Sequence, residues 1–116
     1  MGLIDKLTGG GGSRDFAQEF KTAFDEHNWD KLQPILDDWN KADQADPNCQ
    51  LALIMMTAPA KDIEFRKLCV IFDGASKNKL GAKIANPGLN SWFISSARTM
   101  LSFRARDEGV DLDDYI

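Results

Sequence analysis

Histidine, cysteine and long apolar runs are scarce in this chain of 116 residues. It has one histidine, two cysteines, one tyrosine and four prolines, and its longest apolar run, residues 51–56, is short. A membrane-spanning helix needs about 20 apolar residues, so we expect none. The first residues lack the basic segment and long apolar core of a secretory signal. We therefore expect a cytoplasmic protein.

The few potential nucleophiles and metal ligands do not form a recognisable site. Cys49 and Cys69 belong to no Cys-x-x-Cys pair, and their apolar neighbours favour reduced, buried thiols. His27 follows two acidic residues, but consecutive helix positions point about 100° apart, and zinc needs converging ligands. The glycines at 9–12 lack the Lys and the Ser or Thr of a phosphate-binding loop. We expect no enzyme activity, no metal and no cofactor.

Composition divides the chain into three parts. Four glycines and a serine at 9–13 predict a flexible head and a Gly-rich tether over residues 1–13. Residues 14–106 carry apolar side chains at helical spacing and predict one helical domain. Residues 107–116 hold five acidic side chains and predict an acidic C-terminal tail.

Apolar side chains recur at helical spacing in six segments of the central part. These segments lie near residues 14–27, 30–44, 47–58, 65–73 and 76–85, and from residue 90 or 91 onward. The pair Asp73-Gly74 predicts the C-terminal cap of the fourth helix. A strand at 68–72 is the alternative there, but no comparable partner strand exists. We predict an all-α fold, a single compact domain of about five or six helices built from antiparallel helical hairpins.

A pattern of aromatic, apolar and closing Asp-Pro residues spans positions 27–48. It consists of His27-Asn28-Trp29-Asp30-Lys31-Leu32, Ile35, Trp39, Ala42 and Asp46-Pro47-Asn48. The pattern resembles the second half of a tetratricopeptide repeat, which implies the packing of a helical hairpin. It departs from that repeat in its length and at Ile35, where the repeat prefers Ala, and no second copy follows at the repeat period.

Charge is distributed unevenly, although the net charge is only −4. Residues 15–46 hold nine acidic and three basic side chains, whereas residues 61–106 hold three acidic and nine basic ones. One explanation is that the two segments face each other in the fold and form exposed ion pairs, which contribute about 0–1 kcal/mol each. The other is that each segment presents a charged face to a partner.

Three functions fit these patterns. The first is a non-catalytic protein-binding module, an adaptor or a small acidic inhibitor or immunity-type protein, which meets a basic partner protein through Asp30, Asp37, Asp38 and Asp43. The second is an anion- or RNA-binding module that uses a basic face of residues 61–106. The candidate residues of that face are Arg66, Lys67, Lys77, Lys79, Lys83, Arg98, Arg104 and Arg106. The third is a peripheral membrane protein tethered by residues 1–8.

The three tryptophans leave two interpretations open. Trp29, Trp39 and Trp92 each fit an apolar stripe of the core or its border. Alternatively, any of them is an exposed aromatic side chain that docks against a partner, since tryptophan is enriched at binding hot spots.

Overall fold

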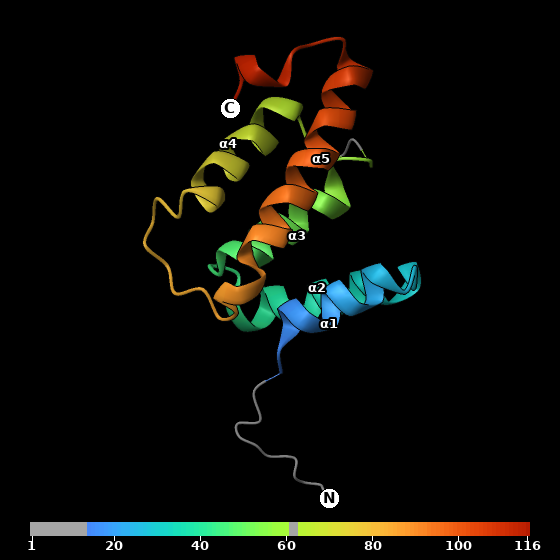
Figure 1. Ribbon diagram of the computed structural model, residues 1–116, viewed down its shortest axis with the longest axis vertical. Helices are drawn as coiled ribbons and strands as arrows, with labels where there is room; N and C mark the ends of the chain where they lie inside the picture. Colours follow the sequence, from blue (N-terminus) through green and yellow to red (C-terminus); the bar gives the residue numbers. More distant parts are fainter. Residues whose placement is uncertain (1–13, 61–62) are drawn as a thin grey trace, which may run out of the picture.

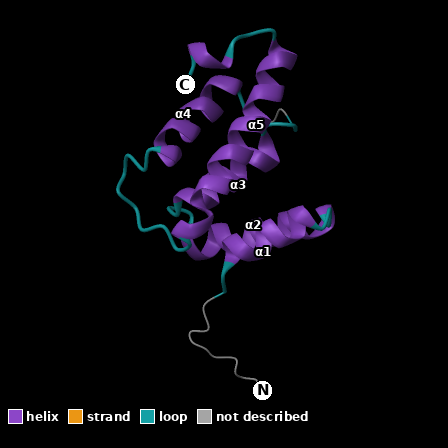
Figure 2. Ribbon diagram, viewed as in Figure 1, coloured by secondary structure: helices purple, strands orange, loops and turns teal. Residues whose placement is uncertain are grey.

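Helices account for all the regular structure in residues 14–60 and 63–116, the part of the chain that the computed structural model describes (Figures 1 and 2). No strand occurs there, so the prediction of an all-α fold is confirmed. The elements are α1 (Phe16–Asp25), α2 (Trp29–Asp43), α3 (Pro47–Thr57), α4 (Phe65–Ser76) and α5 (Asn90–Glu108), with short 3₁₀ turns η1 (Pro87–Leu89) and η2 (Leu112–Asp114). The predicted head and membrane segment lie outside the described residues.

Helices α1 and α2 pack as a hairpin across one end of a bundle formed by α3, α4 and α5 (Figure 1). Asp15 caps α1 by accepting a hydrogen bond from the Gln18 N–H at 3.1 Å. His27 takes a left-handed backbone conformation, with φ of 57°, and reverses the chain between the two helices. Among the described helices, none is long and apolar enough to cross a membrane.

Aromatic side chains fill the junction between the hairpin and the bundle. The ring of Trp39 lies 6.3 Å from that of Phe20 and 5.6 Å from that of Phe93, measured between centroids. All three side chains are buried. Helix α3 runs through the centre and is apolar on nearly all sides, so it contacts α2, α4 and α5. These contacts unite the apolar side chains of α1 to α5 in one core.

Helix α4 ends later than the sequence predicts. We expected a left-handed cap at Asp73-Gly74, but Gly74 is helical and the helix continues to Ser76. The left-handed position falls instead on Asn78, whose φ is 46°. The predicted cap was wrong because asparagine, like glycine, tolerates this conformation. The alternative of a strand at 68–72 was also wrong, since these residues belong to α4.

The predicted helix over residues 76–85 is a loop beyond the end of α4. The Asn78 amide binds the backbone of Ala82 twice: its Nδ2 donates to the carbonyl at 2.9 Å and its Oδ1 accepts from the N–H at 3.0 Å. Gly81 is left-handed, with φ of 65°. These side-chain bonds replace helical ones, so the prediction was wrong here.

A chain of polar side chains ties together the starts of α1, α3 and α5. The Asn86 Nδ2 donates to the carboxylate of Asp15, with distances of 3.2 and 3.0 Å to its two oxygens. The Nδ2 of Asn48, which is fully buried, donates to the Asn86 carbonyl at 3.0 Å. The Asn90 Nδ2 donates to the Asn48 Oδ1 at 2.7 Å. This network fixes where α3 begins relative to its neighbours.

The residues after α5 turn back onto the bundle. Gly109 ends the helix in a left-handed conformation, with φ of 73°. Leu112 is buried, and the ring of Tyr115 meets Phe65 of α4 edge-on at 4.9 Å. The segment predicted as an acidic tail, residues 107–116, therefore packs apolar side chains against the bundle.

Arg104 of α5 is a buried cation whose hydrogen bonds connect this helix to the end of α3 and to the segment before α4. Its Nη1 donates to the Ala58 carbonyl at 3.1 Å, its Nη2 to the Ile63 carbonyl at 2.9 Å, and its Nε to Glu108 Oε2 at 2.8 Å. The side chain is 5% exposed. The guanidinium thus satisfies carbonyls at the end of α3 and before α4.

We predict that Arg104→Ala lowers the free energy of unfolding by about 2–4 kcal/mol, because it leaves buried carbonyls without donors. Urea denaturation measures this loss. The matched control is Arg98→Ala, which breaks an exposed ion pair to Asp113 and costs under about 1 kcal/mol. Equal losses for the two variants would contradict the structural role of Arg104.

Candidate functional site

The four acidic residues proposed for partner binding are all exposed on α2, but they face different surroundings. Asp38 accepts a hydrogen bond from Arg14 at 2.8 Å. Asp43 lies at a cleft beside α1. Asp30 and Asp37 are two helical turns apart and share one side of α2. The predicted acidic residues therefore do not share one environment. Asp38 is ion-paired and Asp43 lines a cleft, whereas Asp30 and Asp37 form a stripe along one side of α2.

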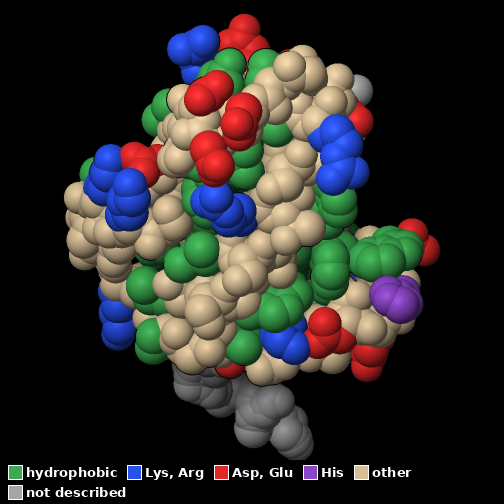
Figure 3. Space-filling model, turned by 45° about the horizontal axis from the view of Figure 1, so that its top comes forward, with side chains coloured by type: hydrophobic (Ala, Val, Ile, Leu, Met, Phe, Trp, Pro, Cys, Tyr) green, Lys and Arg blue, Asp and Glu red, His purple; other side chains and the backbone are tan. Residues whose placement is uncertain are grey.

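Several of the predicted anion-binding residues are paired with carboxylates. Lys77 and Lys79 both bind Asp73, and their hydrogen bonds lower the pKa of that carboxyl to about 2. Arg98 binds Asp113 at 3.4 Å. Figure 3 shows basic and acidic side chains interspersed on the face in view. On this face, opposite charges neutralise each other at short range.

The other predicted anion-binding residues have different surroundings. Arg104 lies in the interior, as described above. Arg66 and Arg106 each lie over an aromatic ring, at 5.5 and 5.7 Å from its centroid. Lys83 is exposed in the loop before α5, and Lys67 is exposed near the start of α4. The structure does not gather these residues into one basic face.

An apolar groove of about 520 Å³ runs between the end of α2, α3, α4 and the loop after α4. Apolar side chains including Leu53, Val70 and Leu80 line it, with Asn40 and Gln44 at its polar rim. Val70 is 69% exposed and Leu80 is 86% exposed. We call this hollow the α3–α4 groove. Exposed apolar side chains on a concave surface are typical of binding sites.

The loop that carries Leu80 is held in place. The two bonds between Asn78 and Ala82 close the loop around Leu80. Lys77 and Lys79, which flank Asn78, are both tied to Asp73. Leu80 is therefore displayed to solvent on an ordered support.

A second cleft, of about 360 Å³, lies on the α1 side of the turn between α2 and α3. Its lining includes the parallel rings of Phe16 and Trp39, 6.2 Å apart, and the carboxylates of Asp43 and Asp46. Arg14 also lines it. We call this hollow the Asp46 cleft.

Asp46 is a buried carboxylate that is only half satisfied. Its side chain caps α3, because Oδ1 accepts a hydrogen bond from the Asn48 N–H at 3.0 Å. Its Oδ2 has no hydrogen-bond partner, and within residues 14–60 and 63–116 no other buried side-chain nitrogen or oxygen lacks one. Burial raises the pKa of this carboxyl, although N–H groups of Asn48, Trp39 and Ala85 oppose the shift. An unsatisfied buried polar group costs about 1–3 kcal/mol.

An aromatic corner lies at the turn between α1 and α2. The His27 ring stacks on Trp29 at 5.3 Å, and Phe24 meets Trp29 edge-on at 5.3 Å. Figure 3 shows the histidine beside hydrophobic side chains. Trp29 is 54% exposed, whereas Trp39 is buried and Trp92 half-buried. Of the three tryptophans, Trp29 is thus the one displayed to solvent.

No group of three or more potential metal ligands occurs among the described residues. No protein-family model, curated protein or solved structure matches the chain. The α3–α4 groove and the Asp46 cleft were missed by sequence reasoning, which placed Cys49, Leu53 and Val70 in apolar helix segments. The exposure of Val70 on a helix whose other apolar residues are buried or partly buried is a signal that only the structure supplies.

We predict that both cysteines are unreactive in the native protein. Cys49 and Cys69 are buried free thiols, as expected from their sequence context. Burial, with smaller contributions from Asp46 and Asp43, raises the pKa of Cys49 to about 12, and burial raises the pKa of Cys69. Titration with an aromatic disulfide reagent near pH 8 should detect neither thiol before denaturation and both afterwards. Rapid labelling of the native protein would contradict this burial.

We predict that Asp46→Asn raises the melting temperature at neutral pH. Because the native pKa of Asp46 is raised, its stabilising contribution is present below the usual value of 3.8 and is lost as the pH rises through the native pKa. The asparagine keeps a carbonyl cap for α3 and removes the buried charge. A gain of about 1 kcal/mol corresponds to about 4–8 °C.

Thermal melts between about pH 4 and pH 8 measure this gain, which should shrink as the pH falls. The control is Asp111→Asn, an exposed cap of η2 at the other end of the molecule, which should change little at any pH. A loss of stability in Asp46→Asn that does not vary with pH would contradict the account.

Proposed function

We propose that this protein is a non-catalytic protein-binding module that receives an amphipathic segment of a partner in the α3–α4 groove. The observation that carries the proposal is the exposure of Val70 and Leu80 on this groove, with Leu80 held by an ordered loop. Full burial of an aliphatic side chain contributes about 1.5–3 kcal/mol. Burial of both side chains by a partner therefore contributes up to about 3–6 kcal/mol.

The charge beside the groove indicates the chemistry of the partner. Asn40 and Gln44 line the groove, and Asp37 lies one turn before Asn40 on the same side of α2. Asp30 continues this stripe. Neither Asp30 nor Asp37 forms an ion pair with a lysine or arginine of the described residues. A segment with apolar side chains in the groove and basic ones along the stripe is complementary to this surface.

The chemistry of the groove wall favours binding over catalysis. The nucleophile that lines it, Cys49, is 2% exposed and has a pKa of about 12. Such a thiol stays protonated near neutral pH and is a poor nucleophile. The polar groups at the rim are amides, which can position a peptide by hydrogen bonds.

The test uses a photo-crosslinking amino acid at position 80 of the full chain in its native host, with position 102 on α5 as the control. We expect one partner to crosslink from position 80 and not from Ser102, which is exposed outside the groove. The affinity of that partner should then fall by about 30-fold for Leu80→Asp, since about 2 kcal/mol of burial is lost. Calorimetric titration measures this loss.

The matched control is Phe103→Asp on α5, which changes an apolar side chain of 51% exposure to the same carboxylate. It should leave the affinity unchanged. Asp37→Lys should weaken binding and reduce its dependence on salt. A loss of affinity in Phe103→Asp together with unchanged affinity in Leu80→Asp would contradict the proposal.

A further inference from the structure

Trp29, at the start of α2, is a large aromatic side chain that is exposed but held in place. It is 54% exposed. The His27 ring stacks on it, and Phe24 meets it edge-on, each at 5.3 Å. Phe24 in turn meets Trp92 of α5 edge-on at 5.6 Å. An indole that is already ordered by neighbouring rings loses little side-chain entropy when a partner covers it.

The same aromatic corner already holds one cation of the chain. The Lys21 Nζ lies 5.5 Å from the centroid of Trp92 and forms an ion pair with Asp25. A cation on an indole, with a carboxylate as its counter-charge, is a favourable arrangement. Trp29 and Asp30 also supply an indole and a carboxylate. Within residues 14–60 and 63–116, however, no lysine or arginine lies over Trp29 or pairs with Asp30.

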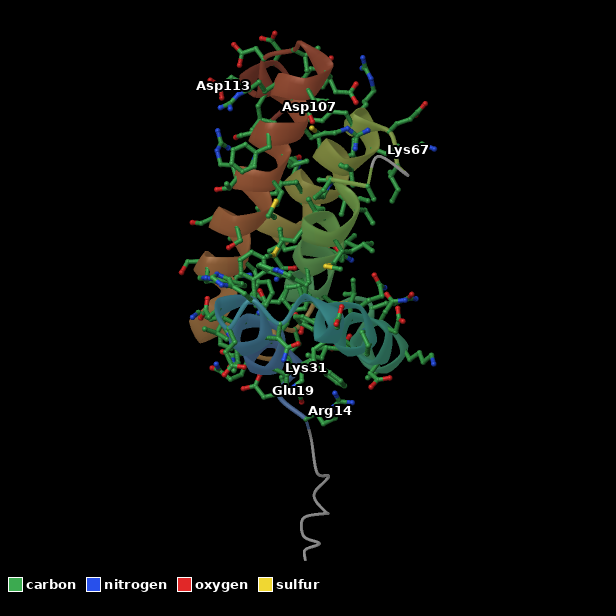
Figure 4. All side chains as sticks on the ribbon, turned by 90° about the vertical axis from the view of Figure 1, so that its right-hand side faces the viewer. Arg14, Glu19, Lys31, Lys67, Asp107 and Asp113 are labelled. Carbon is green, nitrogen blue, oxygen red and sulfur yellow. The ribbon has the colours of Figure 1, made fainter. Side chains whose placement is uncertain are left out.

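Lys31, the basic residue next to Asp30 in the sequence, lies on a different side of α2. It lines the hollow between α1 and α2 together with Glu19 and Glu26. Figure 4 shows Lys31 and Glu19 near each other on the hairpin. Successive helix positions point about 100° apart, so Lys31 points about 200° away from Trp29. The negative charge beside the exposed indole is therefore available to a cation from another molecule.

Trp29 shares one side of α2 with the rim of the α3–α4 groove. Trp29 and Asn40, which lines the groove, are about three helical turns apart, roughly 16 Å along the helix. Gln33 and Asp37 lie between them on this side and are joined by a hydrogen bond of 2.9 Å. All four side chains are exposed. A segment that leaves the groove along α2 therefore reaches Trp29.

We propose that the partner segment in the α3–α4 groove continues along this side of α2 and places an arginine side chain on Trp29, with Asp30 as its counter-charge. Arginine is favoured because its planar guanidinium stacks on aromatic rings and is more weakly hydrated than an ammonium group. The exposed carboxylates of Asp30 and Asp37 are complementary to a basic segment. The inference rests on the proposed function for the path of the partner, whereas Trp29 and Asp30 are not part of the groove.

The test places the photo-crosslinking amino acid at position 33 of the full chain in its native host, beside the variants at positions 80 and 102. We expect positions 33 and 80 to capture the same partner and position 102 to capture neither this partner nor another. Mass spectrometry of the crosslinked peptides should place both crosslinks in one segment, with an arginine in the part joined to position 33. A segment without an arginine there overturns the proposal.

The crosslinks separate this inference from the proposed function. Capture from position 80 and not from position 33 overturns the inference and leaves the groove standing. Capture from position 33 alone rejects the groove and, with it, the continuous path along α2. Capture from neither position rejects both.

Variants of the captured complex test the chemistry at Trp29. Trp29→Leu, which removes the indole and keeps an apolar side chain, should weaken binding about fivefold, the change expected for one cation–π contact. This loss should disappear when glutamine replaces the arginine of the partner. Phe103→Leu, the matched change of an aromatic side chain that is 51% exposed, should leave the affinity unchanged. A fivefold loss that persists with the glutamine variant assigns Trp29 an apolar contact and overturns the role of arginine.

Asp30→Asn tests the counter-charge without altering the aromatic rings. It should weaken binding and reduce its dependence on salt, because one exposed carboxylate is lost from the interface. Asp114→Asn, an exposed change at the other end of the molecule, is the control and should have neither effect. Equal affinity and equal salt dependence for Asp30→Asn and the unmodified protein overturn the proposal.

Discussion

The hydrogen bonds of Asn48 fix the junction on which both candidate surfaces depend. This side chain is fully buried at the start of α3, and its amide is satisfied at both ends, by the Asn86 carbonyl and by Asn90. A buried amide whose nitrogen and oxygen are both hydrogen-bonded favours one arrangement of the elements around it. The turn between α2 and α3 is set by this arrangement, and the groove and the cleft flank that turn.

Asp46 lies two residues before Asn48, but only one of its two carboxylate oxygens accepts a hydrogen bond. One of its oxygens caps α3 and the other is buried without a donor. An arrangement of this kind costs about 1–3 kcal/mol, which is a large part of the 5–15 kcal/mol that stabilises a typical domain. The nearby N–H groups of Trp39 and Ala85 favour the charged form of this carboxyl, and Arg14 is paired with Glu19 and Asp38.

Sequence patterns predict the helices well where apolar spacing and packing agree, as for the segments near residues 14–27 and 47–58, which contain α1 and α3. They fail after α4, because Leu80 and Ile84 have helical spacing while Asn78 and Gly81 favour a loop through local bonds and left-handed conformations. The candidate sites are harder to predict from sequence than the helices, because they depend on which side chains the tertiary structure buries. The sequence places Arg104 among the candidates for an exposed basic face, but in the structure it is buried and donates a hydrogen bond to a backbone carbonyl. Asp46 caps α3, but the burial of its second oxygen arises from tertiary packing.

The central claim is that a partner binds in the α3–α4 groove, which lies beside the turn between α2 and α3. Hydrogen–deuterium exchange of the full chain, free and bound to the partner captured through position 80, tests this claim most directly. The account predicts slower exchange of the backbone amides at residues 43–50 and 77–82, with little change along residues 98–106 of α5. Slower exchange confined to α5 and the C-terminal residues, with no change around the turn, would contradict it.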